Sequence, residues 1–195
     1  MRNPVLVTPA AELPISVEEV ARLINKVTWV GEAAEVEDAE NIEFQIRAAI
    51  DHYQGWNGIL GISLADQEWR QDYDRFNRDL PIVLGPVLSD GLAVTWRNAE
   101  GQISAVSPSS YALRFDRAGR ALVRFDSAYS FPGDVYEHDG VSVTYRAGYA
   151  DLPHDIKAAI VMRVQLHLDE AATSAADILD KREENLVSKY RRRMV

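Results

Sequence analysis

The sequence predicts an α+β protein in which N- and C-terminal helices pack together and a small antiparallel β-sheet domain is inserted between them. Apolar residues recur at helical spacing near the N-terminus, alternate with polar residues through the middle, and return to helical spacing after Pro153. The expected divisions are N-terminal helices in 1–57, an inserted antiparallel β-domain in 58–147, a long helix completing the helical domain in 148–176, and a C-terminal tail in 177–195.

The first helix is predicted to begin near Val17, because the sequence around it contains two helix-start signals. Ser16 and Glu19 have the spacing of a capping box, and Ile15 and Val20 can pack together as a hydrophobic staple across it. Both signals place the helix start at the same residue.

A second helix is predicted in the stretch that follows Gly31 and ends at Gly55, which could serve as its C-cap. The residues at helical spacing are Ile42, Ile46, Ala49, Ile50 and Tyr53. The acidic residues between Glu32 and Glu43 would occupy its first turns, and we interpret them as a solvated face.

Alternation with period two predicts the strands of the inserted sheet. "GLAVTW" and "QISAV" are separated by the turn "NAEG" and form a first hairpin, and "YALRF" and "ALVRF" form a second one around "DRAGR". "VSVTY" adds a last strand, and "QEWRQDYDRF" is interpreted as an earlier one. A sheet of about five to seven strands follows from these segments.

After Pro153 the chain is predicted to be helical again from about Asp155 to the region of Ala171, with apolar residues around most of the circumference. "TSAAD" interrupts the helical pattern. A terminal helical segment then places Ile178, Leu186, Tyr190 and Met194 in step with a four-residue period. Its end is basic, since Lys189 and Arg191 to Arg193 contribute +4 to a chain whose formal charge is −9.

Composition excludes several classes of function. An excess of acidic residues disfavours a general nucleic-acid coat or an anionic membrane as the main partner. The absence of Cys excludes disulfides, thiolate metal sites and thiol catalysis. No secretory signal and no membrane-spanning run is recognised, so we expect a soluble, intracellular protein without a membrane partner.

Catalytic and metal-binding patterns are not found in the sequence. His52, His138 and His154 each neighbour an Asp, but adjacent residues point in different directions on a helix or a strand, so these pairs are not catalytic dyads. "GWNGILG" lacks the pattern of a nucleotide-binding loop, and no Gly-x-Ser-x-Gly elbow is present. We therefore predict no enzymatic activity, no cofactor and no metal.

Several segments, in order along the chain, resemble the head-tail connector proteins, also called adaptors, of long-tailed phages and gene transfer agents. The segment "VSVTYRAGYADLPHDIKAAIVMRV" resembles the family's strand, Ala-Gly-Tyr joint, Pro-led turn and long helix. "PISVEEVARLI", "DLPIVLGPV" and "LVSKYRRRMV" resemble the family's first helix, Leu-Pro strand start and closing Tyr-Arg tail. Together these segments extend the resemblance over nearly the whole chain.

The resemblance implies a structural role in a virion. A homo-oligomeric ring, in this family a dodecamer, would lie below the portal protein of a DNA-filled capsid, with a tail-side stopper or completion protein docked beneath it. DNA would pass through the ring without specific binding, which suits the acidic composition. Assembly would take place in the bacterial cytoplasm, and the protein would then reside in the neck of the particle.

Two sites are predicted within this framework. The joint between the β-domain and the helical wall would comprise Gly148, Tyr149 and Pro153, with Gly148 permitting a bend. The tail would dock on the portal as an amphipathic helix, through an apolar stripe surrounded by positive charge. The residues assigned to portal binding are Leu186, Tyr190, Arg191, Arg192, Arg193 and Met194.

Two other classes of function remain open on sequence grounds. The same pattern suits an α+β protein-binding module with a small sheet packed on a helix pair, and, less well, a small-molecule hydrolase whose site assembles only in space. The size of the oligomer, measured with and without the portal, discriminates among the three.

Overall fold

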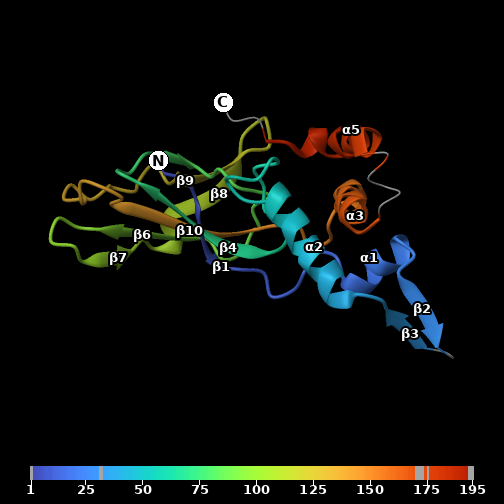
Figure 1. The fold of residues 1–195 in the computed structure, drawn as a ribbon. Coiled ribbons are helices and arrows are strands. Elements are labelled where there is room, and N and C mark those ends of the chain that lie inside the picture. The colour runs from blue at the N-terminus through green and yellow to red at the C-terminus, as the bar shows by residue number, and fades with distance from the viewer. Residues whose placement is uncertain (1, 31–32, 170–173, 175, 193–195) are drawn as a thin grey trace. The chain divides into compact units, whose positions relative to one another are not determined.

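A computed structural model describes residues 2–30, 33–169, 174 and 176–192 (Figure 1). The chain divides into two compact units, each built from separate parts of the sequence. A β unit contains residues 1–10 and 66–148, and a helical unit contains residues 11–65 and 149–195. The structure is mixed α+β, as the sequence predicts.

The helical unit is built around helix α3, which packs against both α2 and α5, while α1 packs against α2 (Figure 1). A two-stranded antiparallel hairpin, β2–β3, lies between α1 and α2 in the sequence. The elements are α1 (Val17–Leu23), β2 (Val27–Val30), β3 (Ala33–Val36), α2 (Ala39–Tyr53), α3 (His154–Leu168), α5 (Ala176–Val187) and the 3-10 turn η2 (Ser188–Tyr190).

The predicted start of α1 is confirmed. The Ser16 hydroxyl accepts a hydrogen bond from the backbone N–H of Glu19 at 3.1 Å, which satisfies one of the free N–H groups of the first turn. Ile15 and Val20, the proposed staple, are both buried in the core of the helical unit. The cap and the staple therefore fix where this helix begins.

Helix α2 has the predicted core but not the predicted start. Its five expected core residues, from Ile42 to Tyr53, are all buried. The segment before it, however, forms the hairpin β2–β3, in which Val27 lies opposite Val36. Glu35 and Glu37 therefore precede the helix, and the expectation that these acids occupy its first turns is wrong. Local pattern missed the hairpin because its strands are only four residues long.

Helix α3 is surrounded by its own chain. Only His154 and His167 are exposed along it, and the other residues are buried or half-buried. Contacts with α2 and α5 cover different sides of this helix, which explains its apolar circumference. No neighbouring subunit is needed to account for that pattern.

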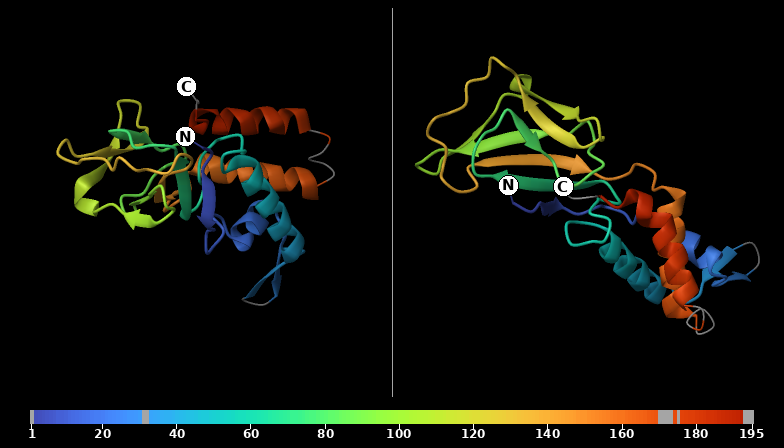
Figure 2. Two further views of the ribbon diagram at one scale, coloured as in Figure 1. Left: turned by 90° about the vertical axis from the view of Figure 1, so that its left-hand side faces the viewer. Right: turned by 90° about the horizontal axis from the view of Figure 1, so that it is seen from above.

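The β unit contains two antiparallel sheets (Figure 2). A five-stranded sheet has the order β1-β4-β10-β6-β7, and a three-stranded sheet has the order β5-β9-β8. The elements are β1 (Val5–Thr8), β4 (Gln67–Tyr73), β5 (Asp79–Pro81), β6 (Ala93–Arg97), β7 (Ile103–Ala105), the 3-10 turn η1 (Pro108–Ser110), β8 (Tyr111–Phe115), β9 (Ala121–Phe125) and β10 (Val141–Ala147).

Both predicted hairpins form, but in different sheets: β6–β7 belongs to the larger sheet and β8–β9 to the smaller. The alternation predicted for the last strand is confirmed, because Val141, Val143 and Tyr145 are fully buried. Ile103 of β7 is 67% exposed although it is apolar, because this strand lies at a sheet edge. Strand β1 was not predicted, since its sequence, Val-Leu-Val-Thr, does not alternate.

Each unit has its own hydrophobic core. The core of the β unit is rich in aromatic rings: Phe76 stacks on Phe131 with centroids 5.2 Å apart, and Phe125 stacks on Tyr129 at 5.4 Å. The buried Gln71 amide bonds the carbonyl of Pro81 at 3.2 Å and the N–H of Val83 at 3.0 Å. These bonds join β4 of one sheet to the segment around β5 of the other.

Candidate functional site

The C-terminal segment, residues 176–192, carries all of the predicted portal-binding residues that the structure describes. Helix α5 ends at Val187 and the 3-10 turn η2 follows, so Leu186 and Tyr190 do not lie on one continuous α-helix. Val187 is fully buried, and Leu186 and Tyr190 pack half-buried against the core of the helical unit. Ile178, the first residue of the expected stripe, is 58% exposed instead.

Polar contacts hold this segment on the helical unit. The Lys189 ammonium pairs with the Asp155 carboxylate of α3, which also receives the Tyr190 hydroxyl at 3.4 Å. This hydrogen bond from Lys189 holds the pKa of Asp155 below its ordinary value. The backbone N–H of Arg192 donates to the carbonyl of Leu60 at 2.9 Å. The described part of the tail is therefore folded against its own unit.

Arg191 is the most exposed of the predicted portal-binding residues that the structure describes. It is exposed and lies 3.9 Å from the Glu184 carboxylate, a loose surface pair. Arg193 and Met194 lie outside the described residues. Docking of this segment on a portal stays a prediction, and its described charged groups are oriented by contacts within the helical unit.

A polar cluster joins the three long helices of the helical unit. Glu183 of α5, only 5% exposed, pairs with the Arg163 guanidinium of α3 at 3.1 Å. Arg163 also lies 2.9 Å from Nε2 of His52 on α2, and 5.9 Å above the ring of Tyr53. Sequence reasoning missed this cluster because its members are far apart in the chain. The one available signal was a single Arg within the apolar run "IVMRVQL".

The protonation of this cluster follows from burial and from its charges. Burial lowers the pKa of His52, and the Arg163 cation lowers it further, against the opposing effect of Glu183. Burial, together with the Glu183 carboxylate, raises the pKa of the Tyr53 hydroxyl. His52 is therefore held neutral, as an acceptor for Arg163, and Tyr53 keeps its proton. We assign the cluster the role of fastening α5 to α2 and α3.

The predicted joint coincides with the place where the chain leaves the β unit. The boundary between the units falls between Gly148 and Tyr149. Gly148 has φ +143°, a conformation that favours glycine, and its N–H donates to the carbonyl of Pro86 at 2.9 Å. Tyr149 packs on the core of the helical unit, and Pro153 precedes α3, where its carbonyl accepts the N–H of Ile156.

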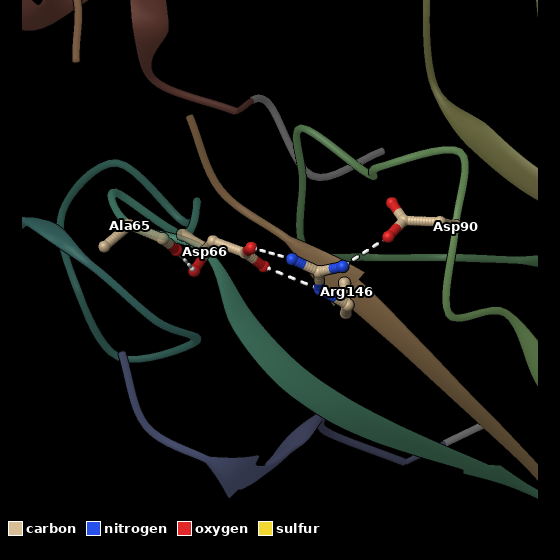
Figure 3. Close-up of polar contacts among 5 residues, drawn as sticks. Ala65, Asp66, Asp90 and Arg146 are labelled. Atoms are coloured by element: carbon tan, nitrogen blue, oxygen red, sulfur yellow. Dashed lines mark hydrogen bonds and ion pairs between the residues drawn. The ribbon is translucent and has the colours of Figure 1, made fainter. Parts of the chain in front are cut away.

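Arg146 forms the most extensive ion pair beside this boundary (Figure 3). Its guanidinium makes two parallel bonds to the Asp66 carboxylate, with Nε 3.0 Å from Oδ1, and a further bond to Asp90. Asp66 directly precedes β4, and Arg146 lies near the end of β10, the neighbouring strand. Gly91 packs closely on the Arg146 stem, where a Cβ would lie 2.8 Å from Cδ. The ion pair thus links the start of β4, where the chain enters the β unit, to the end of β10, where the chain leaves it.

The described part of the chain offers no group of three His, Asp or Glu side chains arranged to hold a metal ion. Within the same residues, no helix is both long and apolar enough to cross a bilayer.

Solved structures share this fold over nearly its whole length. A chain in the neck of an empty gene transfer agent (GTA) particle, computed with C6 symmetry, matches with a TM-score of 0.71 at 19% sequence identity, covering 98% of this chain and 96% of that one. A chain in the neck of a native GTA particle, computed with C12 symmetry, matches with a TM-score of 0.67 at 21% identity, covering 100% and 97%. A chain in the virion of a native GTA particle gives 0.63 at 20% identity, covering 86% and 84%.

No protein-family model matches the chain, and no curated protein matches it. The likeness to the particle chains therefore stands on three-dimensional structure and extends through both units. It confirms, at the level of the fold, a resemblance to chains of gene transfer agent particles. The neighbours are particle components, two of them in the neck, which agrees with the predicted location.

Proposed function

We propose that this chain is a structural subunit of the neck of a phage or gene transfer agent particle, where copies form an adaptor ring below the portal. The observation that carries the proposal is the match to neck chains over 98–100% of this chain. A fold alone does not define a function, but here the likeness includes both units and their order along the sequence. Assembly, rather than catalysis, is then the activity of the protein.

The ring itself is supported by the symmetry of the neighbouring particles. The necks that contain the similar chains were computed with C6 and C12 symmetry, as expected for cyclic assemblies of repeated subunits. A dodecamer that surrounds a central channel is consistent with C12 symmetry. Within the ring, a formal charge of −9 per chain would repel the phosphates of DNA in transit, so the channel would conduct DNA without gripping it.

Contacts with the portal above and with a stopper or completion protein below complete the proposed role. The basic C-terminal segment is our candidate for the portal side, because Lys189 and Arg191 are exposed and Arg193 follows them in the sequence. Arginine pairs well with carboxylates, and a ring presents each contact many times, so individually weak contacts suffice. Leu186 and Tyr190, being half-buried in the helical unit, would orient this segment rather than enter a portal groove.

Deletion of this gene in cells that produce the particle tests the proposal. We expect DNA-filled heads that lack tails or leak DNA, and restoration of complete particles by the wild-type gene on a plasmid. In parallel, light scattering of the purified chain mixed with the portal protein should reveal a large complex. Intact, tailed particles in the deletion strain, together with a chain that stays monomeric beside the portal, would contradict a neck role.

A further inference from the structure

The hairpin β8–β9 ends in a rigid, basic turn. The Asp116 carboxylate accepts the N–H groups of Ala118 at 2.8 Å and Arg120 at 2.9 Å, and it also pairs with the Arg120 side chain at 2.6 Å. One acid thereby fixes the turn from within. The flanking cations, Arg114 and Arg117, are exposed and form no ion pair with any residue that the structure describes.

An uncovered aromatic ring lies next to these cations. Tyr111, Leu113 and Phe115 alternate along one face of β8, and their exposure increases toward the turn, from buried through half-buried to 57% exposed at Phe115. The core of the β unit covers only the first part of this face. Arg114 precedes Phe115 on the opposite face of β8, and Arg117 follows it in the turn, so the hairpin end carries an exposed ring and two cations that pair with no described residue. Aromatic and Arg side chains are both enriched at protein interfaces.

The outer face of α2 has the opposite charge and a second uncovered ring. Glu40, Phe44 and Asp51 are spaced four and seven residues apart, which places them on one side of the helix. Phe44 is 67% exposed, and neither Glu40 nor Asp51 forms an ion pair among the described residues. The acidic character extends beyond this face, because residues 11–65 carry ten acidic and three basic side chains.

We propose that the β8–β9 turn of one subunit docks on the outer face of α2 of the next subunit. Phe115 would pack against Phe44, while Arg114 and Arg117 pair with Glu40 and Asp51. The two surfaces are different parts of the same chain, so the contact is head-to-tail, and head-to-tail contacts generate rings when the rotation closes. The inference rests on the ring of the proposed function and names the surfaces that build it.

Duplex DNA is the other partner that a basic turn could meet. An exposed aromatic ring at the same hairpin end favours a protein, because the phosphate backbone of a duplex offers charge but no apolar surface to Phe115. The α2 face supplies both the carboxylates and an aromatic ring. The contact between copies is therefore favoured, and DNA binding becomes an outcome to be tested.

Cysteine cross-linking tests the contact without background, because the chain contains no Cys. The double variant Phe44→Cys/Phe115→Cys is treated with a short bis-maleimide in assembled particles and in mixtures with the portal protein. We expect a ladder of covalent oligomers that extends beyond dimers, because each subunit is linked to two neighbours. A mixture of the two single variants should give dimers only, and these should contain one copy of each.

The matched control is Phe44→Cys/Ile103→Cys, which moves the second cysteine to another exposed apolar residue of the β unit. This pair should give no ladder. Charge reversal by Arg114→Glu/Arg117→Glu should abolish the ladder in the cysteine background, and addition of Glu40→Arg/Asp51→Arg should restore it. Rescue is expected only if the two pairs of charges face each other.

Each failure has a distinct meaning. If wild-type protein joins the portal while Phe44→Cys/Phe115→Cys gives no ladder, this interface is wrong and the neck role is unaffected. If the charge reversal leaves the ladder intact but abolishes retention of a duplex DNA probe in gel-shift experiments, Arg114 and Arg117 bind DNA and their proposed pairing with Glu40 and Asp51 is wrong. If the wild-type chain never associates with portal-bearing particles, the proposed function itself is wrong.

Discussion

Arg146 and Asp66 are eighty residues apart in the sequence, yet they form a two-point ion pair that joins β10 to the residue directly before β4, with Nε 3.0 Å from Oδ1. Asp66 is the residue at which the chain enters the β unit from the helical unit, and Arg146 lies two residues before it leaves. The planar guanidinium suits this geometry, because its fork matches both oxygens of a carboxylate. The ion pair therefore holds the entering and leaving strands in register at the end of the sheet.

We expect Arg146→Met to loosen this end of the sheet. The substitution leaves Asp66 and Asp90 without their shared cation, so limited proteolysis should cleave the chain faster between residues 147 and 152, and amide exchange of Gly148 should increase. Arg124→Met is the control, since Arg124 forms a comparable two-point pair with Asp79 between β9 and β5. Equal cleavage in both variants would show that the Arg146 pair has no special influence on the joint.

Glu183→Gln should destabilise the helical unit. The change leaves the Arg163 cation without its buried carboxylate, and breaking a buried ion pair costs about 3 kcal/mol in the free energy of unfolding. Arg163→Met combined with Glu183→Gln should recover part of that loss, because no unpaired cation remains. The free energy of unfolding is measured by urea denaturation, with hydrogen exchange of the α3 amides as the probe. Glu184→Gln, at an exposed neighbouring position, should change stability by less than about 0.5 kcal/mol.

The lowered pKa of His52 predicts how the stability of the helical unit depends on pH. Its pKa is lowered in the folded chain, so the unfolded chain takes up a proton first as the pH falls below about 6.5. The contribution of His52 is therefore complete above this pH and decreases as the pH falls from there toward the pKa of the folded state. Thermal midpoints measured from about pH 7.5 to 5 should fall less steeply in His52→Gln. Identical slopes for the two proteins would refute the assignment.

Truncation of the C-terminal segment should unfold more than the segment itself, because Val187 is fully buried. Val187→Ala alone should cost about 2 kcal/mol of stability. A clean test of portal docking must therefore preserve Val187. Arg191→Glu/Arg193→Glu should leave the thermal midpoint unchanged while weakening association with the portal, as measured by co-sedimentation. If this variant associates with the portal as strongly as the wild-type chain, Arg191 and Arg193 do not take part in docking.

Gly148→Ala should strain the backbone at the boundary between the units. With φ at +143°, an alanine side chain costs about 1–3 kcal/mol. Gly133→Ala is the control, because an added Cβ there meets nothing within 4 Å and the backbone is not in a positive-φ conformation. Calorimetry should show a lower midpoint temperature of unfolding for Gly148→Ala and an unchanged one for Gly133→Ala. A neutral Gly148→Ala would indicate that the chain can bend there without glycine.

The parts of this fold that follow from local sequence were predictable. Ser16 and Glu19 defined the start of α1, and alternation of Val141, Val143 and Tyr145 defined β10. Strand β1 was not predictable, because its pairing partner, β4, lies about sixty residues away and its own sequence does not alternate. The assignment of the two hairpins to separate sheets likewise depends on long-range pairing, such as that of Leu80 with Val123.

The candidate site shows the same division. Gly148, Tyr149 and Pro153 could be recognised because they are close together and interrupt a strand-to-helix pattern. The cluster of His52, Arg163 and Glu183 could not be recognised, since these residues are far apart in the sequence and only the packing of three helices brings them together. The apolar stripe of the tail was predicted from spacing alone, and the change from α-helix to 3-10 turn after Val187 alters that spacing.

The discontinuous arrangement of the two units has a consequence for biosynthesis. The β unit is complete once residue 148 has left the ribosome, because its first strand, β1, is already available to pair with β4. The helical unit must wait for its second half, and Val187 reaches the core only after the intervening β unit has been synthesised. A nascent chain therefore displays a finished β8–β9 turn while the helical unit that would hold α2 in place is still incomplete. In the proposed ring, a subunit would offer both contact surfaces only after its release from the ribosome, so ring closure would wait for full-length chains.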